Sequence, residues 1–239
     1  MSKVFVGLSG GVDSAVSAHL LKEEGHDVTG VFIKGWEPDF LPCTGTADRL
    51  EAMRVAAHLG IPFKTYDFEE QYKNHVVDYF VNESRAGRTP SKSGAAWKKE
   101  SGEGTEYIAT GHYARNEETS SGFELSVSKD SVKDQTYFLW TLTQDDLEHA
   151  LFPIGSKNKS EVRSIAKKIA LPNASRKDSQ GLCFLGHVDM RDFLSRYIPK
   201  KRGSITLENG DTVGEHEGVW FYTYGEHVDL AGSSTRMYV

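Results

Sequence analysis

Short apolar runs alternate with helical repeats along the first half of the chain, and this alternation strongly limits the possible folds. Runs at Val4–Leu8, Asp27–Ile33 and Phe63–Phe68 have the length and composition of buried strands. Between them, Val12–Glu24 and Ala47–Leu59 carry apolar residues at helical spacing. Because parallel strands need a crossover connection, strands separated by helices predict a parallel sheet covered by helices.

The alternation continues with an amphipathic helix predicted over Glu69–Arg85 and a further strand over Thr105–Ala114. We therefore predict an α/β domain with a parallel, Rossmann-like sheet over residues 1–150.

The character of the chain changes after Phe152. Basic helices are predicted at Lys159–Ala170 and Val188–Tyr197, which define a small, mainly helical domain over residues 151–202. Residues 203–239 alternate in short pieces with Asn-Gly and Gly turn signals, which is typical of antiparallel strands. We expect this last segment to be the start of a β domain.

Charge is unevenly distributed along the chain. The net charge is −6, but the segment 155–202 holds twelve Lys/Arg and four Asp/Glu, a balance of +8, so the remainder carries −14. Such asymmetry favours a polyanion-binding portion attached to a different kind of domain. A basic, solvated helical surface explains the same count equally well.

The cysteine count and the apolar stretches indicate a cytoplasmic protein. The two cysteines, Cys43 and Cys183, are too few for a disulfide framework or a structural zinc site. No apolar stretch has the length that a membrane span requires, and Met1-Ser2-Lys3 leads into a strand without a signal-like region. We expect no membrane partner.

The turn "GLSGGVDS", from Gly7 to Ser14, joins the first predicted strand to the first helix. Gly10 and Gly11 allow backbone amides to approach a ligand closely, and the positive end of the helix points into the same space. Asp13 could hold a Mg²⁺ ion that accompanies phosphates. The turn is therefore predicted to bind an anion.

Other interpretations of this turn are weaker. It matches the G-x-S-x-G nucleophile elbow with Ser9 as the nucleophile, although that motif is usually found later in a hydrolase sheet. It is neither a Walker A loop nor a G-x-G-x-x-G fingerprint. A tight strand–helix turn capped by a serine needs no ligand at all.

The string "LSGGVDS" resembles the pyrophosphatase (PP) loop of the N-type ATP pyrophosphatases, and further segments resemble the tRNA-specific 2-thiouridylases of that superfamily. These segments follow the order of that family and cover nearly the whole chain. They are "GVFIKGW" (Gly30–Trp36), "AGRTP" (Ala86–Pro90), "ATGHYAR" (Ala109–Arg115), "KDQTYFLW" (Lys133–Trp140), "LFPIG" (Leu151–Gly155), "RKDSQGLCFLG" (Arg176–Gly186) and "GEHEGVWFYTYG" (Gly214–Gly225).

This resemblance implies an adenine nucleotide alpha hydrolase-like fold that binds ATP, with Mg²⁺ at Asp13. The implied ATP-binding residues are Gly7, Leu8, Ser9, Gly10, Gly11, Val12, Asp13 and Ser14 around the phosphates, with Ile33 and Gly111 at the adenine.

The resemblance also implies a reaction on tRNA. Lys133, Asp134 and Gln135 match a segment that contacts tRNA, and Cys183 matches the cysteine that carries a persulfide. In the implied transferase reaction, ATP adenylates the 2-oxygen of the wobble uridine. The persulfide sulfur then replaces that oxygen to give 2-thiouridine. The implied protein partner is a sulfur donor, either a cysteine desulfurase or a sulfur-relay protein.

The chain departs from the family pattern in two places. After "AGRTP" the family continues with Asn-Pro-Asp-x-x-Cys, which supplies a second catalytic thiol, whereas this chain reads "SKSGAAWKKE". Cys43 lies in a different predicted loop and does not replace that thiol. After Gly225 the sequence no longer follows the family, so most of the C-terminal β-barrel is expected to be absent.

These departures leave two alternatives open. One is a catalytically impaired pseudoenzyme or deletion variant that still binds ATP and tRNA. The other is a different N-type ATP pyrophosphatase, a synthetase that adenylates a small carboxylate.

Overall fold

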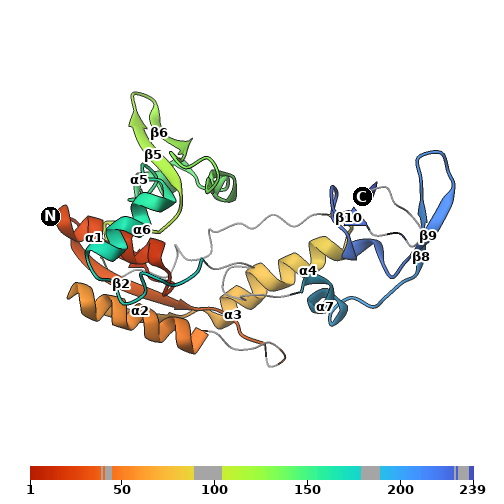
Figure 1. Cartoon of the computed structure of the whole chain (residues 1–239), viewed down its shortest axis with the longest axis horizontal. Helices are drawn as coiled ribbons and strands as arrows, with labels where there is room; N and C mark the ends of the chain where they lie inside the picture. Colours follow the sequence, from red (N-terminus) through yellow and green to blue (C-terminus); the bar gives the residue numbers. More distant parts are fainter. Residues whose placement is uncertain (39, 41–44, 89–103, 179–188, 229, 231–236) are drawn as a thin grey trace. The chain divides into compact units, whose positions relative to one another are not determined.

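A parallel sheet of five strands forms the centre of the first of two compact units (Figure 1). The computed structural model describes residues 1–38, 40, 45–88, 104–178, 189–228, 230 and 237–239. The strand order is β3-β2-β1-β4-β7, and each neighbouring pair is parallel. The strands are β1 (Lys3–Gly7), β2 (Asp27–Lys34), β3 (Phe63–Asp67), β4 (Tyr107–Ala109) and β7 (Ala150–Leu151).

β1 lies in the middle of this sheet because its apolar run is buried on both sides. Val4 and Val6 have no exposed surface, and Phe5 is 3% exposed. Val4 lies opposite Val28 of β2 and Tyr107 of β4. The predicted α/β class with a parallel sheet is confirmed.

Three helices contribute to the same hydrophobic core: α1 (Val12–Glu23), α2 (Gly45–Leu59) and α6 (Lys159–Lys168). α1 contacts β1, β2, α2 and α6, and seven of its twelve residues are buried. Its small residues Ala15, Ser17 and Ala18 are fully buried, so neighbouring elements can approach its backbone closely. Figure 1 shows α6 lying beside α1.

The compact units do not coincide with the boundary predicted near residue 150. The first unit comprises Met1–Tyr72 and Ser93–Gly186, and the second comprises Lys73–Lys92 and His187–Val239. α6 belongs to the first unit because its residues Val162 and Ala166 share the core of the sheet. The division into domains at residues 150 and 202 stays a prediction.

The strand predicted over Thr105–Ala114 is shorter in the structure. β4 ends at Ala109, and the chain then passes the first turn of α1, where a Cβ atom on Gly111 would lie 2.6 Å from the Ser14 nitrogen. This close approach to α1 takes the chain out of the sheet. Ala114 instead begins a new strand.

The segment between β4 and β7 forms structure that the sequence did not predict. An antiparallel hairpin comes first, followed by a short 3₁₀ helix and a one-turn helix. These elements are β5 (Ala114–Thr119), β6 (Gly122–Val127), η3 (Thr136–Leu139) and α5 (Gln144–Glu148).

The helix predicted over Glu69–Arg85 forms as three consecutive pieces. These are α3 (Glu69–Tyr72), a π-helical turn η1 (Lys73–Val77) and α4 (Asp78–Arg85). In the second unit, Phe80 of α4 packs edge-on against Phe193 of α7 (Met190–Ser195), with ring centroids 6.5 Å apart.

Short strands follow α7, as predicted from Gly203 onward. They form two antiparallel pairs, β8 with β9 and β10 with β11. The elements are β8 (Gly203–Thr206), β9 (Thr212–His216), the 3₁₀ helix η4 (Val219–Phe221), β10 (His227–Val228) and β11 (Met237–Tyr238). Among the described residues, no helix is both long enough and apolar enough to span a bilayer.

The shared core of α6 and the sheet yields a stability prediction. Replacing Val162 by Ala should lower the free energy of unfolding by about 2 kcal/mol, since it removes buried methyl groups and leaves a cavity. Urea denaturation followed by circular dichroism measures this change. Lys167→Ala, on the exposed face of the same helix, is the matched control and should change stability little. If both variants lowered the free energy of unfolding equally, α6 would not pack on the sheet as described.

Candidate functional site

The turn between β1 and α1 has backbone groups that a ligand can use. Leu8 donates its backbone N–H to the carbonyl of Val31 at 2.8 Å, so the turn begins directly at the sheet. Gly10 has φ +77°, a conformation that favours glycine. Gly11 is the N-cap of α1, and no side chain caps the first amides of this helix. These amides can therefore face an anion.

Two serine hydroxyls stabilise the same turn. Ser9 Oγ accepts a bond from the Gly11 N–H at 3.3 Å, and Ser14 Oγ donates to the Gly11 carbonyl at 3.2 Å. The two hydroxyl oxygens lie 3.4 Å apart. Within the described part of the chain, Ser9 has no histidine partner, so the arrangement gives no support to a nucleophile elbow.

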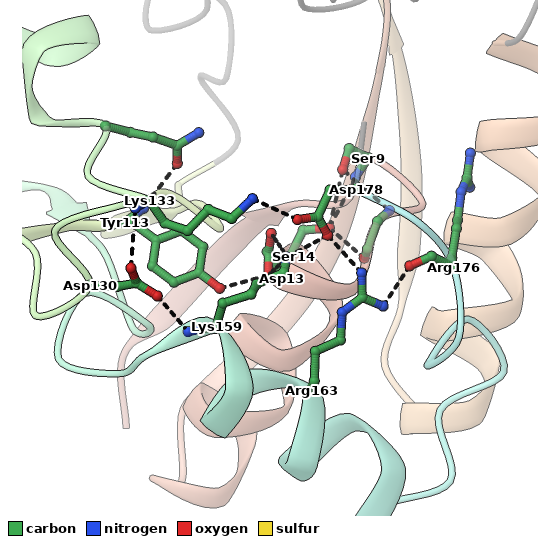
Figure 2. Close-up of polar contacts among 12 residues, drawn as sticks. Ser9, Asp13, Ser14, Tyr113, Asp130, Lys133, Lys159, Arg163, Arg176 and Asp178 are labelled. Carbon is green, nitrogen blue, oxygen red and sulfur yellow. Dashed lines mark hydrogen bonds and ion pairs between the residues drawn. The ribbon is translucent and has the colours of Figure 1, made fainter. Parts of the chain in front are cut away.

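Asp13, in the first turn of α1, accepts bonds from two residues outside the turn (Figure 2). The Lys159 ammonium lies 2.8 Å from each carboxylate oxygen, and the Tyr113 hydroxyl donates to one of them at 3.0 Å. Burial, together with the negative charge of Asp13, raises the pKa of Tyr113 above its ordinary value. The Tyr113 hydroxyl therefore stays protonated at neutral pH and donates a hydrogen bond to Asp13.

Asp178 accepts bonds from three cationic side chains, as Figure 2 shows. Lys159 lies 2.7 Å from it, Lys133 2.9 Å and Arg163 2.6 Å. Burial alone would raise the pKa of Asp178, but bonds from Lys159 and Lys133 outweigh burial and hold the pKa well below its ordinary value. The hydrogen bond to Asp178 likewise raises the pKa of Lys133. We call Asp13, Asp178, Lys133, Lys159 and Arg163 the ion-pair cluster.

The chain leading to Asp178 is attached to the same turn. Buried Asn173 donates to the carbonyl of Gly10 at 2.9 Å, and Arg176 donates to that carbonyl at 3.2 Å. Arg176 also pairs with Asp48 of α2. Residues 173–178 therefore line the turn that the sequence singled out.

The predicted ATP-binding residues lie together at one edge of the sheet. Gly7 ends β1, Ile33 is the last residue but one of β2, and Gly111 follows β4. These three strands are adjacent and parallel, so their carboxyl ends share one edge. The structure thus brings Gly7–Ser14, Ile33 and Gly111 to the same edge; their role in binding ATP stays a prediction.

The three residues matched to tRNA contact lie next to this edge and already have partners. Lys133 belongs to the ion-pair cluster. Asp134 accepts bonds from the Ser128 N–H and the Thr136 hydroxyl, at 2.8 and 2.7 Å. Gln135 accepts a bond from the Tyr113 N–H at 3.1 Å. These contacts attach the loop before η3 to Tyr113.

Some predicted features lie outside the described residues. Cys183, the predicted persulfide carrier, is one of them, and Cys43 is another. The same holds for the whole segment "SKSGAAWKKE", residues 91–100, which replaces Asn-Pro-Asp-x-x-Cys.

Sequence reasoning missed several residues that the structure brings to the turn. Tyr113 and Asp178 lie inside the quoted segments "ATGHYAR" and "RKDSQGLCFLG", but no role was assigned to them. Lys159 and Arg163 were counted only as part of a basic segment. Their spacing of four residues puts both on one face of α6, and this was the available signal.

Comparison with known proteins matches nearly the whole chain to one family. The family model "tRNA methyl transferase HUP domain" matches residues 2–187, and "tRNA methyl transferase PRC-barrel domain" matches residues 191–239. The tRNA-specific 2-thiouridylase MnmA of Listeria monocytogenes is 43% identical over 239 residues, which covers 95% of this chain and 64% of that protein. MnmA of Nitrosomonas europaea is 44% identical, over 98% of this chain and 68% of that protein.

Solved structures are more distant. A 4-thiouridine synthetase in complex with RNA and ATP has 18% identity and a TM-score of 0.48, over 83% of this chain and 50% of that chain. The assignment therefore rests on the sequence matches, which extend from the sheet and its glycine turn to the short strands of the second unit. They confirm the resemblance seen in the motifs: the chain belongs to the family of tRNA-specific 2-thiouridylases.

Proposed function

We propose that this chain takes part in the ATP-dependent 2-thiolation of the wobble uridine of tRNA, as a sulfurtransferase. The observation that carries the proposal is the glycine turn at the carboxyl edge of the sheet, with the ion-pair cluster beside it. The proposal is also supported by the similarity to MnmA, although the chain spans only 64% of the Listeria relative.

ATP would bind with its phosphates at the turn. Gly10 and Gly11 present backbone amides there, and Ser9 and Ser14 add hydroxyls. A helix N-terminus without a side-chain cap attracts negative charge. Ile33, near the end of β2, and Gly111, just after β4, flank the turn, and the adenine would lie there.

Mg²⁺ would accompany the phosphates. This ion prefers oxygen ligands and keeps several of them from phosphate and water. The Asp13 carboxylate and the Ser9 and Ser14 hydroxyls form a donor set of the required type. Asp13 would hold the ion, which would help to neutralise charge on the leaving pyrophosphate.

The proposed reaction has two stages. The uracil 2-oxygen attacks the α-phosphate of ATP and pyrophosphate leaves, which turns that oxygen into part of an AMP leaving group. The terminal sulfur of a Cys183 persulfide then attacks C2, and AMP departs with the oxygen. A second thiol must break the remaining S–S bond to release 2-thiouridine, and it forms a disulfide with Cys183. In this chain an external thiol would have to take that role.

The tRNA would contact the Lys133–Gln135 loop and basic residues of the segment 155–202. Several of these cations are already paired: Lys159 and Arg163 in the ion-pair cluster, and Arg176 with Asp48. Lys167 and Lys168, by contrast, are exposed in the last turn of α6. These exposed lysines are the better candidates for phosphate contacts.

A cysteine desulfurase or sulfur-relay protein in the cytoplasm would supply the sulfur.

Nucleotide binding is tested by replacing Asp13 with Asn, which keeps an acceptor for Tyr113 but removes the charge. Affinity for ATP in the presence of Mg²⁺ should fall about tenfold or more, because the metal loses its carboxylate. With EDTA in place of Mg²⁺, the Asp13→Asn variant should bind ATP as tightly as the unmodified chain, or more tightly. Isothermal titration calorimetry measures both.

The matched control for this variant is Asp27→Asn, an exposed carboxylate at the amino end of β2. It should leave ATP binding unchanged. Equal Mg²⁺-dependent affinity in the Asp13→Asn variant and the unmodified chain would contradict the assignment of the turn.

Binding of tRNA should weaken steeply as salt concentration rises, because lysine contacts release counterions from the phosphates. Removing Lys167 and Lys168 together should reduce the slope of log affinity against log salt by roughly 1–2. Filter binding at several salt concentrations gives the slope. The control is Lys22→Ala, which removes a positive charge from the last turn of α1. This variant should leave the slope of log affinity against log salt unchanged. A salt-independent affinity would mean that these basic residues are only a solvated surface.

Sulfur transfer should stop after one turnover unless a thiol is added. The segment after Pro90 lacks the second cysteine of the family, so thiolation should be at most stoichiometric with Cys183. Nucleoside mass spectrometry after incubation with tRNA, ATP and a persulfide source measures the yield. Inserting Asn-Pro-Asp-x-x-Cys after Pro90 should allow repeated turnovers, and Cys183→Ala should abolish the first.

Two results would change this interpretation. Repeated turnovers by the unmodified chain would contradict the role given to the missing thiol and would point to Cys43. ATP and tRNA binding without any thiolation, even after the insertion, would favour the pseudoenzyme.

A further inference from the structure

We propose that Asn173 is a positioning residue of the nucleotide site, which fixes the orientation of the peptide group between Gly10 and Gly11. Its side-chain amide holds the Gly10 carbonyl away from the ligand, so that the Gly11 N–H faces the phosphates. This inference rests on the proposed function, since it assumes that a polyphosphate binds at the turn. Neither the sequence motifs nor the family comparison assigned a role to Asn173.

The peptide group between Gly10 and Gly11 can take up two orientations unless a contact selects one of them. A peptide unit is planar and trans, so its carbonyl and its N–H point in opposite directions. Glycine adopts positive and negative φ about equally well, and Gly10 already has φ +77°. In the reversed orientation, the carbonyl oxygen would point at the phosphates and repel them. The turn therefore needs a contact that keeps this oxygen on the other side.

Two side chains supply that contact. Asn173 donates its side-chain N–H to the Gly10 carbonyl at 2.9 Å, and Arg176 donates to the same oxygen at 3.2 Å. At the opposite end of the peptide group, the Gly11 N–H donates to Ser9 Oγ at 3.3 Å, which is longer than a usual N–H···O bond. The carbonyl is thus firmly held, whereas the N–H is weakly bonded and can donate to a phosphate oxygen instead.

The segment that carries Asn173 is itself fixed. Leu171 is 4% exposed and belongs to the core of the sheet. The Arg176 N–H donates to the Asn173 carbonyl at 2.9 Å. Arg163 of α6 donates to the carbonyls of Ala174 and Arg176, at 3.0 and 2.5 Å (Figure 2). The amide of Asn173 is therefore delivered to the turn by a rigid stretch of chain.

Packing alone does not explain an asparagine at this position. Asn173 is 3% exposed, and its Oδ1 has no hydrogen-bond partner among the described residues. A buried acceptor without a partner destabilises a fold, so an apolar side chain of the same size would suit the packing better. Because a carbonyl oxygen can only accept, the amide nitrogen must face Gly10. The contact with Gly10 is the feature that distinguishes asparagine from such an apolar residue.

Asn173 also separates positioning from charge. Arg176 contacts the same carbonyl, but its positive charge attracts any anion near the turn as well. Asn173 is neutral, so its replacement changes the support of the Gly10 carbonyl without changing the net charge of the site. A loss of phosphate affinity in such a variant therefore reports on the orientation of the peptide group.

The first test is the binding of inorganic pyrophosphate, ATP and adenosine to the Asn173→Leu variant, measured by calorimetry in the presence of Mg²⁺. Affinity for pyrophosphate and ATP should fall about tenfold, the loss expected for one hydrogen bond to a charged ligand. Affinity for adenosine, which has no phosphate, should stay the same. Asn173→Gln keeps the amide donor and should recover part of the loss.

Val28→Ala is the control for a general loss of stability. Val28 is 3% exposed and lies at the amino end of β2, whereas the turn lies at the carboxyl edge of the sheet. This variant should lower the midpoint of thermal unfolding and leave pyrophosphate affinity unchanged. If Asn173→Leu does not fold, Asn173→Ala, which removes the donor and adds no bulk, takes its place.

The second test observes the peptide group directly by NMR. Gly10 and Gly11 are the only two adjacent glycines in the sequence, so glycine labelled with ¹³C at its carbonyl and with ¹⁵N gives a single doubly labelled peptide group. Its carbonyl signal should shift upfield in Asn173→Leu, because a carbonyl that loses a hydrogen bond becomes more shielded. The signal should stay in place in Val28→Ala. Pyrophosphate should move the Gly11 proton downfield in the unmodified chain.

Several results would overturn the inference. One is unchanged pyrophosphate affinity in Asn173→Leu, and another is an unchanged carbonyl signal of Gly10 in that variant. Equal losses of pyrophosphate and adenosine affinity would show a general disturbance of the site and would overturn it as well.

The failure of this inference differs from a failure of the proposed function. An unmodified chain that binds neither ATP nor pyrophosphate would contradict the nucleotide site as a whole. An unmodified chain that binds both, with an Asn173→Leu variant that binds them equally well, would remove only the role of Asn173.

Discussion

The burial of α1 is the constraint on which the rest of the first unit depends. This helix contacts the sheet, α2 and α6, and its small residues Ala15, Ser17 and Ala18 are fully buried. Larger side chains at these positions would hold its neighbours away. The close approach of α6 to α1 brings Lys159 to Asp13, and Gly111 allows the chain after β4 to pass the same turn. The burial of α1 therefore determines both the packing of the core and the geometry of the site.

Electrostatic balance is the second organising feature. A count of residues alone suggests that the positively charged segment 155–202 forms one surface for a polyanion. In the structure its cations fall into two groups. Lys159, Arg163 and Arg176 pair with carboxylates close to the turn, whereas Lys167 and Lys168 stay exposed. Paired cations near the turn suit recognition of a small polyphosphate, and exposed ones suit a large nucleic acid. One basic stretch can thus serve two ligands.

The proposed activation and sulfur-transfer steps depend on different parts of the chain. Groups suited to ATP lie on the strands and helices of the first unit, where core packing fixes them. The thiol chemistry depends on Cys183, five residues beyond Asp178, and on a partner cysteine that the sequence lacks at the position where the family has it. Asp178 connects the two parts, since it pairs with Lys159 and begins the stretch that leads to Cys183.

The fold class, the main elements of the parallel sheet and the position of the glycine turn could all be predicted from the sequence. This was possible because these features depend on local periodicity and on glycines with unusual backbone angles, such as Gly10. The sequence also identified the family, through motifs that keep their order along the chain. The strand predicted over Thr105–Ala114 was too long because its end is decided by contact with α1, which no local pattern records.

The pairing of the charged residues, by contrast, depends on how distant segments of the chain pack together. Lys159 and Asp13 are 146 positions apart, and Arg176 and Asp48 are 128 apart, so no local spacing connects them. Nor could composition show that α6 shares the core of the sheet, because a basic helix has the same pattern whether it packs on a neighbouring domain or on this one. Ion pairing depends on distances of a few ångströms, and those distances are fixed when α1, α6 and the sheet pack together.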